Sequence, residues 1–194
     1  MEFRILGPLV VLDDGEELPL GPAKERTVLA ALLLRAGSIV SRTQLVEDLW
    51  GESPPLTAAR AVNVYVSQLR KTLGKERLQT RPPGYVLRVA KDELDLARFQ
   101  RLLEAGEAKE ALALWRGEPL SDFAYSRFAQ SEIARLEELR LAALEERIEA
   151  NLARGRHGEL VGELEGLVRE HPTRERLRAQ LMLARAGSRF CVLS

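Results

Sequence analysis

The sequence has one cysteine, Cys191, and two histidines, His157 and His171. A lone thiol cannot form an internal disulfide bond, and three such scattered side chains lack the spacing of a metal site. Neither histidine has a nearby serine or cysteine in a triad context, and no glycine-rich phosphate loop occurs. We therefore expect no metal, no cofactor and no catalytic residue. Both histidines fall at expected helix boundaries, where a capping or surface role is the alternative to chemistry.

Long apolar runs are also missing. No stretch approaches the roughly 18 uninterrupted apolar residues of a membrane span, and the N-terminus lacks a basic segment followed by an apolar one and a cleavage site. The composition, 45% apolar and 30% charged, is that of a globular protein. We expect no membrane association and a cytoplasmic location.

The formal net charge is zero, but the charge is unevenly distributed. Residues 57–90 hold seven basic side chains and one acidic side chain, whereas residues 91–194 hold 17 basic and 19 acidic. A local basic patch in a neutral chain suits the binding of phosphates. A solvated charged face is the alternative interpretation.

The first 90 residues predict strands, then three helices, then a hairpin. The predicted strands are Phe3–Leu6 and Leu9–Leu12, followed by a turn at 13–15. A first helix is expected from Pro22 to about Arg35. A second follows Ser41 to Gln44, which has the form of a capping box, and ends near Gly51.

The third helix is expected to start after an N-cap at Thr57 and to stop at Gly74. Residues 78–80 and 85–89 then pair as a hairpin with Arg81 to Gly84 at its tip. From Asp92 the pattern is helical without strand signals, with helices near 95–105, 107–116, 126–154, 157–170 and 173–186. Similar segments about 32 residues apart, 150–155 and 183–187, favour a tetratricopeptide-like repeat.

The predicted third helix has two different faces. Its apolar face consists of Val62, Tyr65, Val66, Leu69 and Leu73, and its polar face of Arg60, Asn63, Val64, Ser67, Arg70 and Lys71. Such a helix fits the major groove of DNA, where base edges carry a readable pattern. The fold class is therefore α+β, with a winged helix-turn-helix and its small antiparallel sheets at 1–90 and an all-α tetratricopeptide-like domain at 91–194.

Several side chains on or beside the polar face suggest contacts with DNA. The amides of Asn63 and Gln68 can pair with adenine, the Arg70 guanidinium suits guanine, and Val64 can touch a thymine methyl group. Other basic residues are better placed for phosphates, namely Arg42, Arg60, Lys71 and Lys75. At the hairpin tip, Arg81 suits a narrow minor groove. For any one of these residues, simple solvent exposure is an equal alternative.

These segments resemble the OmpR/PhoB-type winged-helix domain in the form found in the Streptomyces antibiotic regulatory protein (SARP) family. The resemblance rests on LGPAKERTVLAALLLRAGSIVSRTQLVEDLWGESPP, AVNVYVSQLRKTLG and QTRPPGYVLRV. The later segments DLARFQRLLEAG, ALALWRGEPLSDF and RLEELRLAALEERIEANLARGRH resemble the bacterial transcriptional activation domain of that family.

The resemblance implies an activator that binds direct repeats in double-stranded DNA near biosynthetic promoters, as a homodimer at least on DNA, and recruits RNA polymerase. A regulator that occludes DNA without activating is the alternative. Backbone-contacting positions of the family match Arg42, Trp50, Arg60 and Tyr85. Its groove-facing positions match Asn63, Val64, Ser67, Gln68 and Arg70, and its wing arginine matches Arg81. The wing turn is one residue shorter than in response regulators and contains Pro82-Pro83.

The end of the chain departs from this pattern. Family members continue past the position of Leu183 with further helices, whereas this sequence closes with an apolar tail, 185–194. Three explanations remain open. An exposed helix face remains after loss of the last repeat, the tail covers that face within one chain or across a dimer, or the gene product is truncated.

Overall fold

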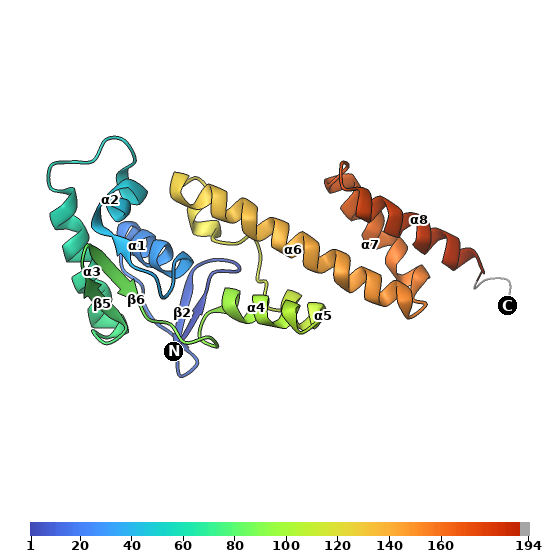
Figure 1. Cartoon of the computed structure of the whole chain (residues 1–194), viewed down its shortest axis with the longest axis horizontal. Helices are drawn as coiled ribbons and strands as arrows, with labels where there is room; N and C mark the ends of the chain where they lie inside the picture. Colours follow the sequence, from blue (N-terminus) through green and yellow to red (C-terminus); the bar gives the residue numbers. More distant parts are fainter. Residues whose placement is uncertain (191–194) are drawn as a thin grey trace.

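In the computed structural model, residues 1–190 are described. The winged-helix half lies at one end of an elongated molecule, and the last two helices lie at the other (Figure 1). Cys191 and the rest of the segment 191–194, on which the expectation of a covering tail partly rests, lie outside the described residues.

The first sheet opens the chain and is antiparallel. Its strands, in spatial order, are β1 (Glu2–Arg4), β2 (Val10–Asp13) and β3 (Glu16–Glu17). Phe3 pairs with Val11, and both are fully buried. Asp14 and Gly15 form the turn between β2 and β3 with φ angles of 48° and 88°. The predicted strand-first opening is confirmed.

Three helices and a second sheet complete the winged helix. They are α1 (Ala23–Leu34), β4 (Val40–Ser41), α2 (Arg42–Trp50), α3 (Ala58–Leu73), β5 (Leu78–Arg81) and β6 (Gly84–Leu87). The sheet order is β4-β6-β5, so the hairpin is attached beside the start of α2. A Cβ on Gly84 would lie 1.9 Å from the Val40 carbonyl oxygen, and this close approach requires glycine. The predicted order is confirmed.

Two predicted helix caps differ from the structure. Ser41 Oγ accepts from the Gln44 amide at 3.0 Å as expected, but the Gln44 side chain donates to Asp48, at 3.1 Å, instead of returning to Ser41. Asp48 lies one turn further along the same face and competes for that amide. Thr57 makes no side-chain cap, because its backbone (φ −89°, ψ 1°) is not the extended conformation that an N-cap needs.

The second half of the chain is helical. Its elements are α4 (Asp95–Glu104), α5 (Ala108–Leu112), the 3-10 turn η1 (Ser121–Phe123), α6 (Arg127–Ala153), α7 (His157–Glu170) and α8 (Glu175–Phe190). The helix predicted to reach residue 116 ends at Leu112, since the Arg116 amide donates to the Leu6 carbonyl at 2.8 Å. The similarity predicted around Gly155 and Gly187 is also limited: Gly155 ends a helix with φ 77°, whereas Gly187 lies inside α8.

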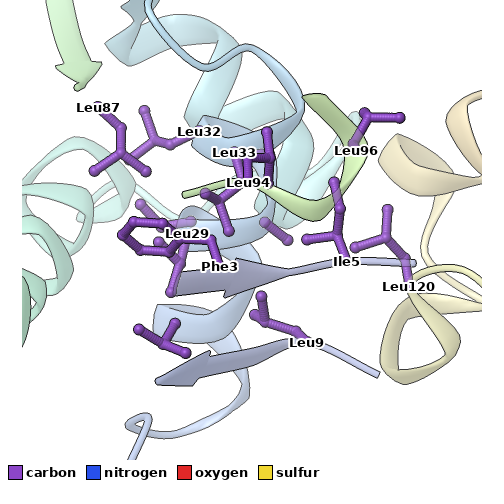
Figure 2. Packing of buried hydrophobic residues seen from close by; sticks show 14 of the residues in the cluster. Phe3, Ile5, Leu9, Leu29, Leu32, Leu33, Leu87, Leu94, Leu96 and Leu120 are labelled. Carbon is purple, nitrogen blue, oxygen red and sulfur yellow. The ribbon is translucent and has the colours of Figure 1, made fainter. Parts of the chain in front are cut away.

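Both halves share one apolar core. Phe3 and Ile5 of the first segment pack with Leu29 of α1, Leu96 of α4 and Leu120, and all five are buried (Figure 2). A second cluster joins α6, α7 and α8 through Leu141, Ile148, Leu152, Leu160, Leu164, Leu177, Leu181 and Ala184. The division near residue 90 stays a prediction, and the first core spans that position.

The segment from Phe3 to Leu9 joins the halves by hydrogen bonds as well. The Asp95 carboxylate, at the start of α4, accepts from the amides of Ile5 and Leu6 at 2.9 Å and from that of Leu96 at 2.8 Å. Leu94 forms an isolated parallel bridge with Phe3, which the expectation of helix alone after Asp92 missed. Burial raises the pKa of Asp95, and these amide donors oppose that rise.

We predict that Asp95→Ala lowers the free energy of unfolding by about 2–4 kcal/mol, because it leaves buried backbone amides without an acceptor. Urea denaturation measures this loss. Asp92→Ala is the control, since the Asp92 side chain is 72% exposed, and we expect a change within about 0.5 kcal/mol. Equal effects of the two substitutions would contradict this role of Asp95.

Candidate nucleic-acid interface

Helix α3 presents opposite faces to the core and to solvent. Val62, Val66, Leu69 and Leu73 are buried on one side. On the other side Asn63 and Ser67 are exposed, and Val64 exposes 49% of its surface. Tyr65, predicted to be buried, is half-buried. The exposed side of α3 is therefore free to meet a ligand along its length.

Tyr85 of β6 connects the wing to this helix. Tyr85 is 4% exposed, and its hydroxyl donates to Asn63 Oδ1 at 2.7 Å. The guanidinium carbons of Arg42 and Arg70 lie 6.0 and 5.9 Å from the ring centroid. An aromatic face stabilises nearby guanidinium groups, so Tyr85 supports two cations from α2 and α3.

Arg70 is attached to the wing. Its Nε donates to the Leu78 carbonyl at 2.8 Å, and its Nη2 donates to Thr80 Oγ1 at 2.7 Å. Both acceptors belong to β5. The predicted pairing of Arg70 with guanine stays a prediction, and in this structure two of its donors already hold the hairpin against α3.

The tip of the wing hairpin is also joined to the start of α2. Ser41 pairs with Gly84 in the sheet, and the Arg42 amide donates to the Pro83 carbonyl at 3.4 Å. These contacts bring the Arg42 side chain near Tyr85, although the two residues are far apart in the sequence. The groups that gather around Tyr85 thus come from α2, α3 and the wing.

The remaining predicted site residues lie on α2, α3 and β5. Arg42, Arg60, Lys71 and Arg81 are exposed, and Gln68 is half-buried. Trp50 is half-buried at the end of α2, and Lys24 Nζ of α1 lies 4.6 Å from its ring centroid. At the wing, Arg81 Nη2 donates to Gln79 Oε1 at 3.4 Å.

Sequence reasoning missed two residues that contact predicted site residues, Lys24 beside Trp50 and Thr80 beside Arg70. Lys24 Nζ also donates to the Leu49 carbonyl at 3.0 Å, so it fixes the end of α2 beside Trp50. Thr80 lies directly opposite Tyr85 in the β5–β6 register and receives the Arg70 bond. The alternation of side chains along the hairpin could have placed Thr80, whereas the Lys24 contact depends on how α1 packs on α2.

An acidic group close to the interface is withdrawn into the protein. The side chain of Asp48 in α2 is 4% exposed and pairs with Arg35 at 3.1 Å. Burial raises the pKa of this carboxyl, and the bonds from Gln44 and Arg35 oppose the rise. The segment 57–90, which follows α2, contains a single acid, Glu76, against seven basic residues. The exposed surface of this segment is therefore basic.

Two structural features bear on other classes of function. Within residues 1–190, no three imidazole, thiol or carboxylate groups gather as metal ligands would. None of the helices in this part of the chain combines the length and apolar character required to cross a bilayer.

Comparison with known proteins gives two domain matches. The profile of the C-terminal region of transcriptional regulatory proteins matches residues 15–87, and that of the bacterial transcriptional activator domain matches residues 87–189. The two matches meet at β6.

Curated relatives align along nearly the whole chain. The regulatory protein AfsR of Streptomyces coelicolor is 42% identical over 95% of this chain, which spans 20% of AfsR. The regulatory protein DnrI of Streptomyces peucetius is 35% identical over 95% of this chain and 77% of its own length. A solved structure of Mycobacterium tuberculosis EmbR in complex with a low-affinity phosphopeptide superposes with a TM-score of 0.88. It is 35% identical and covers 96% of this chain and 55% of EmbR.

We predict that Arg70→Lys loosens the wing. A lysine keeps the charge but lacks the planar fork that reaches both Leu78 and Thr80, so the free energy of unfolding falls by about 1 kcal/mol and amide exchange in β5 becomes faster. Hydrogen exchange measures the second effect. Arg60→Lys, on the exposed side of the same helix, should change neither quantity. Unaltered β5 exchange in Arg70→Lys would mean that this bond does not hold the wing.

Proposed function

The chain belongs to the Streptomyces antibiotic regulatory protein family of transcription regulators, and from this premise we propose that it binds specific double-stranded DNA through α3. The observation that carries the proposal is the exposed side of α3 beside the guanidinium groups of Arg42 and Arg70 on Tyr85. A helix with one buried and one polar, cationic side fits the major groove. The protein is a regulator and not an enzyme.

We assign base contacts to the middle of α3. Asn63 keeps its amide nitrogen for a base, because its oxygen accepts from Tyr85. Val64 is exposed enough to contact a thymine methyl group. Ser67 and Gln68 lie further along the same side. Their polar groups suit hydrogen bonds to base edges.

Phosphate contacts are assigned to the cations around this strip. Arg42, Arg60 and Lys71 are exposed, and none of them needs to leave a buried position to reach a phosphate. Trp50 can contact the DNA backbone with the edge of its ring. Tyr85 is too deeply buried for a wide contact, so we propose that it acts mainly by orienting Arg42 and Arg70.

Arg70 has two candidate roles, reading guanine or fixing the wing. Its bonds to β5 favour the second role, since reading a guanine with both amino groups would break the bond to Thr80. A fixed wing in turn aims Arg81, at the end of β5, at the minor groove. There a narrow A·T-rich groove attracts a guanidinium.

For the output we propose activation: binding to direct repeats as a homodimer near a promoter of biosynthetic genes, with recruitment of RNA polymerase. The match of residues 87–189 to a bacterial transcriptional activator domain favours this output. Occlusion of DNA without activation is the alternative.

Lys71→Ala should weaken binding to all DNA sequences to a similar extent. Loss of one phosphate contact lowers the slope of log affinity against log salt by about one, with base preference unchanged. Fluorescence anisotropy across a salt series measures the slope. Lys91→Ala, an exposed lysine outside the proposed interface, is the control. A slope that stays the same in Lys71→Ala would remove this residue from the interface.

Selection of bound sequences from a random DNA pool should enrich two direct half-sites about 10–11 base pairs, or a multiple of that, apart. In Asn63→Ala the preference at one position of each half-site should relax. Enrichment of no sequence would contradict specific recognition.

Transcription in vitro from a promoter bearing the selected repeats should rise when the protein is added with RNA polymerase. Repression on the same template would instead support occlusion. A promoter with scrambled repeats is the control for both outcomes.

A further inference from the structure

A cavity lies where the end of α6 meets α7 and α8, at the end of the molecule opposite α3 (Figure 1). Its volume is about 470 Å³, which falls within the range of pockets that hold small molecules. Leu152 of α6 together with Ala179 and Leu183 of α8 give it apolar sides, and His157 of α7 also lines it. We call this space the α6–α8 cavity.

The cavity follows from the way α8 packs on the other two helices. Gln180 Nε2 donates to the Glu145 carbonyl of α6 at 2.8 Å. A Cβ on Gly187 would collide with the ring of His157 at the start of α7, so α8 also lies close to that helix. Met182, on the outward side of α8, is not among the lining residues. The cavity is therefore a space between three helices and is distinct from the exposed outer side of α8.

Gln180 brings a buried hydrogen-bond acceptor to this cavity. The residue is 4% exposed, and no donor within residues 1–190 bonds to its Oε1 atom, although its Nε2 atom is bonded. A buried amide oxygen without a donor is costly and requires an explanation. The terminal torsion of glutamine is broad, so a small rotation of the amide lets Oε1 accept from a molecule in the cavity.

His157 supplies a second polar atom of the same kind. Its Nδ1 atom is buried without a partner in the part of the chain that the structure describes. The ring lies against Gly187, which is seven residues from Gln180 on α8, and seven residues of helix span about 10 Å. The two polar atoms therefore lie toward opposite ends of the cavity, with apolar side chains between them.

The charged groups that line the cavity balance one another. Arg176 pairs with Glu149, and one of its amino groups lies 3.6 Å from a carboxylate oxygen of Glu145. A charged ligand would meet no unpaired carboxylate or guanidinium among the lining residues. The cavity therefore favours an uncharged ligand, since burying an unpaired charge is unfavourable.

We propose that the α6–α8 cavity binds a small uncharged molecule with an apolar body and a polar group at each end. A carboxamide at one end donates to Gln180 Oε1. A hydroxyl at the other end bonds to His157 Nδ1, because a hydroxyl can serve either tautomer of the imidazole. The apolar body packs between Leu152 and Ala179. This site goes beyond the proposed DNA binding and does not depend on it.

The probe is 4-(4-hydroxyphenyl)butanamide, which carries these two groups on an apolar body. Titration of the ¹⁵N-labelled full chain by ¹H–¹⁵N correlation spectroscopy measures its binding. We expect saturable shifts of the Gln180 side-chain amide and of backbone amides near Leu152, His157 and Leu183. Amides of α3 should not move.

A second compound isolates the bond to Gln180. Methyl 4-(4-hydroxyphenyl)butanoate has the same body but no N–H group, and loss of one hydrogen bond should weaken its binding about tenfold. Gln180→Met should lower the affinity for the amide to that for the ester and leave the affinity for the ester unchanged. A general loss of structure would weaken both compounds alike.

A matched pair of variants tests the location. Ala179→Leu fills the cavity from an exposed position of α8 and should abolish binding of the amide. Met182→Leu alters the outward side of the same helix and should bind the amide normally. Both keep a good helix former, so their thermal midpoints should match that of the unaltered chain.

The same variants separate this site from the proposed DNA binding. Affinity for a single DNA half-site should be unchanged in Gln180→Met, Ala179→Leu and Met182→Leu, because the cavity lies away from α3. A failure of either proposal is thus seen in its own measurement.

Three results would overturn the proposal. Absence of shifts up to the solubility limit of the amide would mean that the cavity holds no such molecule. Equal affinities of the amide and the ester for the unaltered chain would show apolar adsorption without a bond to Gln180. Equal losses in Ala179→Leu and Met182→Leu would place the contact on the outer side of α8.

Discussion

The burial of Asp95 is the constraint on which the relation between the two halves depends. A carboxylate at 2% exposure is tolerated only where donors surround it, and the amides of Ile5, Leu6 and Leu96 supply them. Since two of these amides belong to the first strand segment and the third to α4, the charge can be satisfied only when that segment lies against the helical half. The shared core of Phe3 and Leu120 reinforces the same geometry. Helix α4 is thereby held in a fixed relation to the winged helix.

The proposed interface depends on a second junction of the same kind. Tyr85 is buried between α2 and α3. Its hydroxyl donates to Asn63, its ring lies beside the Arg42 guanidinium, and its strand pairs with β4. Arg70 then fixes the hairpin to α3 through β5. Because these bonds join the wing and the helix, the two parts that would enter adjacent grooves of DNA are positioned together. Loss of one bond would alter the orientation of the cations more than their number.

Much of the fold could be predicted because local patterns suffice for it. Gly74 ended α3 and the tip at Arg81 to Gly84 defined the hairpin, since turns and helix stops depend on neighbouring residues. The errors arose where a distant partner intervened. The Arg116 amide is drawn to Leu6 and shortens the preceding helix, and Gln44 turns to Asp48. For the candidate site, the exposed side of α3 was predictable, but the attachment of Arg70 to Thr80 was not.

By itself the sequence determined the order of the helices and strands in the winged helix, which side of α3 is polar, and where the positive charge concentrates. These properties follow from periodicity and composition within a few turns of chain. Only the tertiary structure decided that Tyr85 carries two guanidinium groups and that Asp95 is buried against the first strand. Each of these depends on distances between residues far apart in the chain. Such distances are set by the packing of whole helices, which no local pattern of residues specifies.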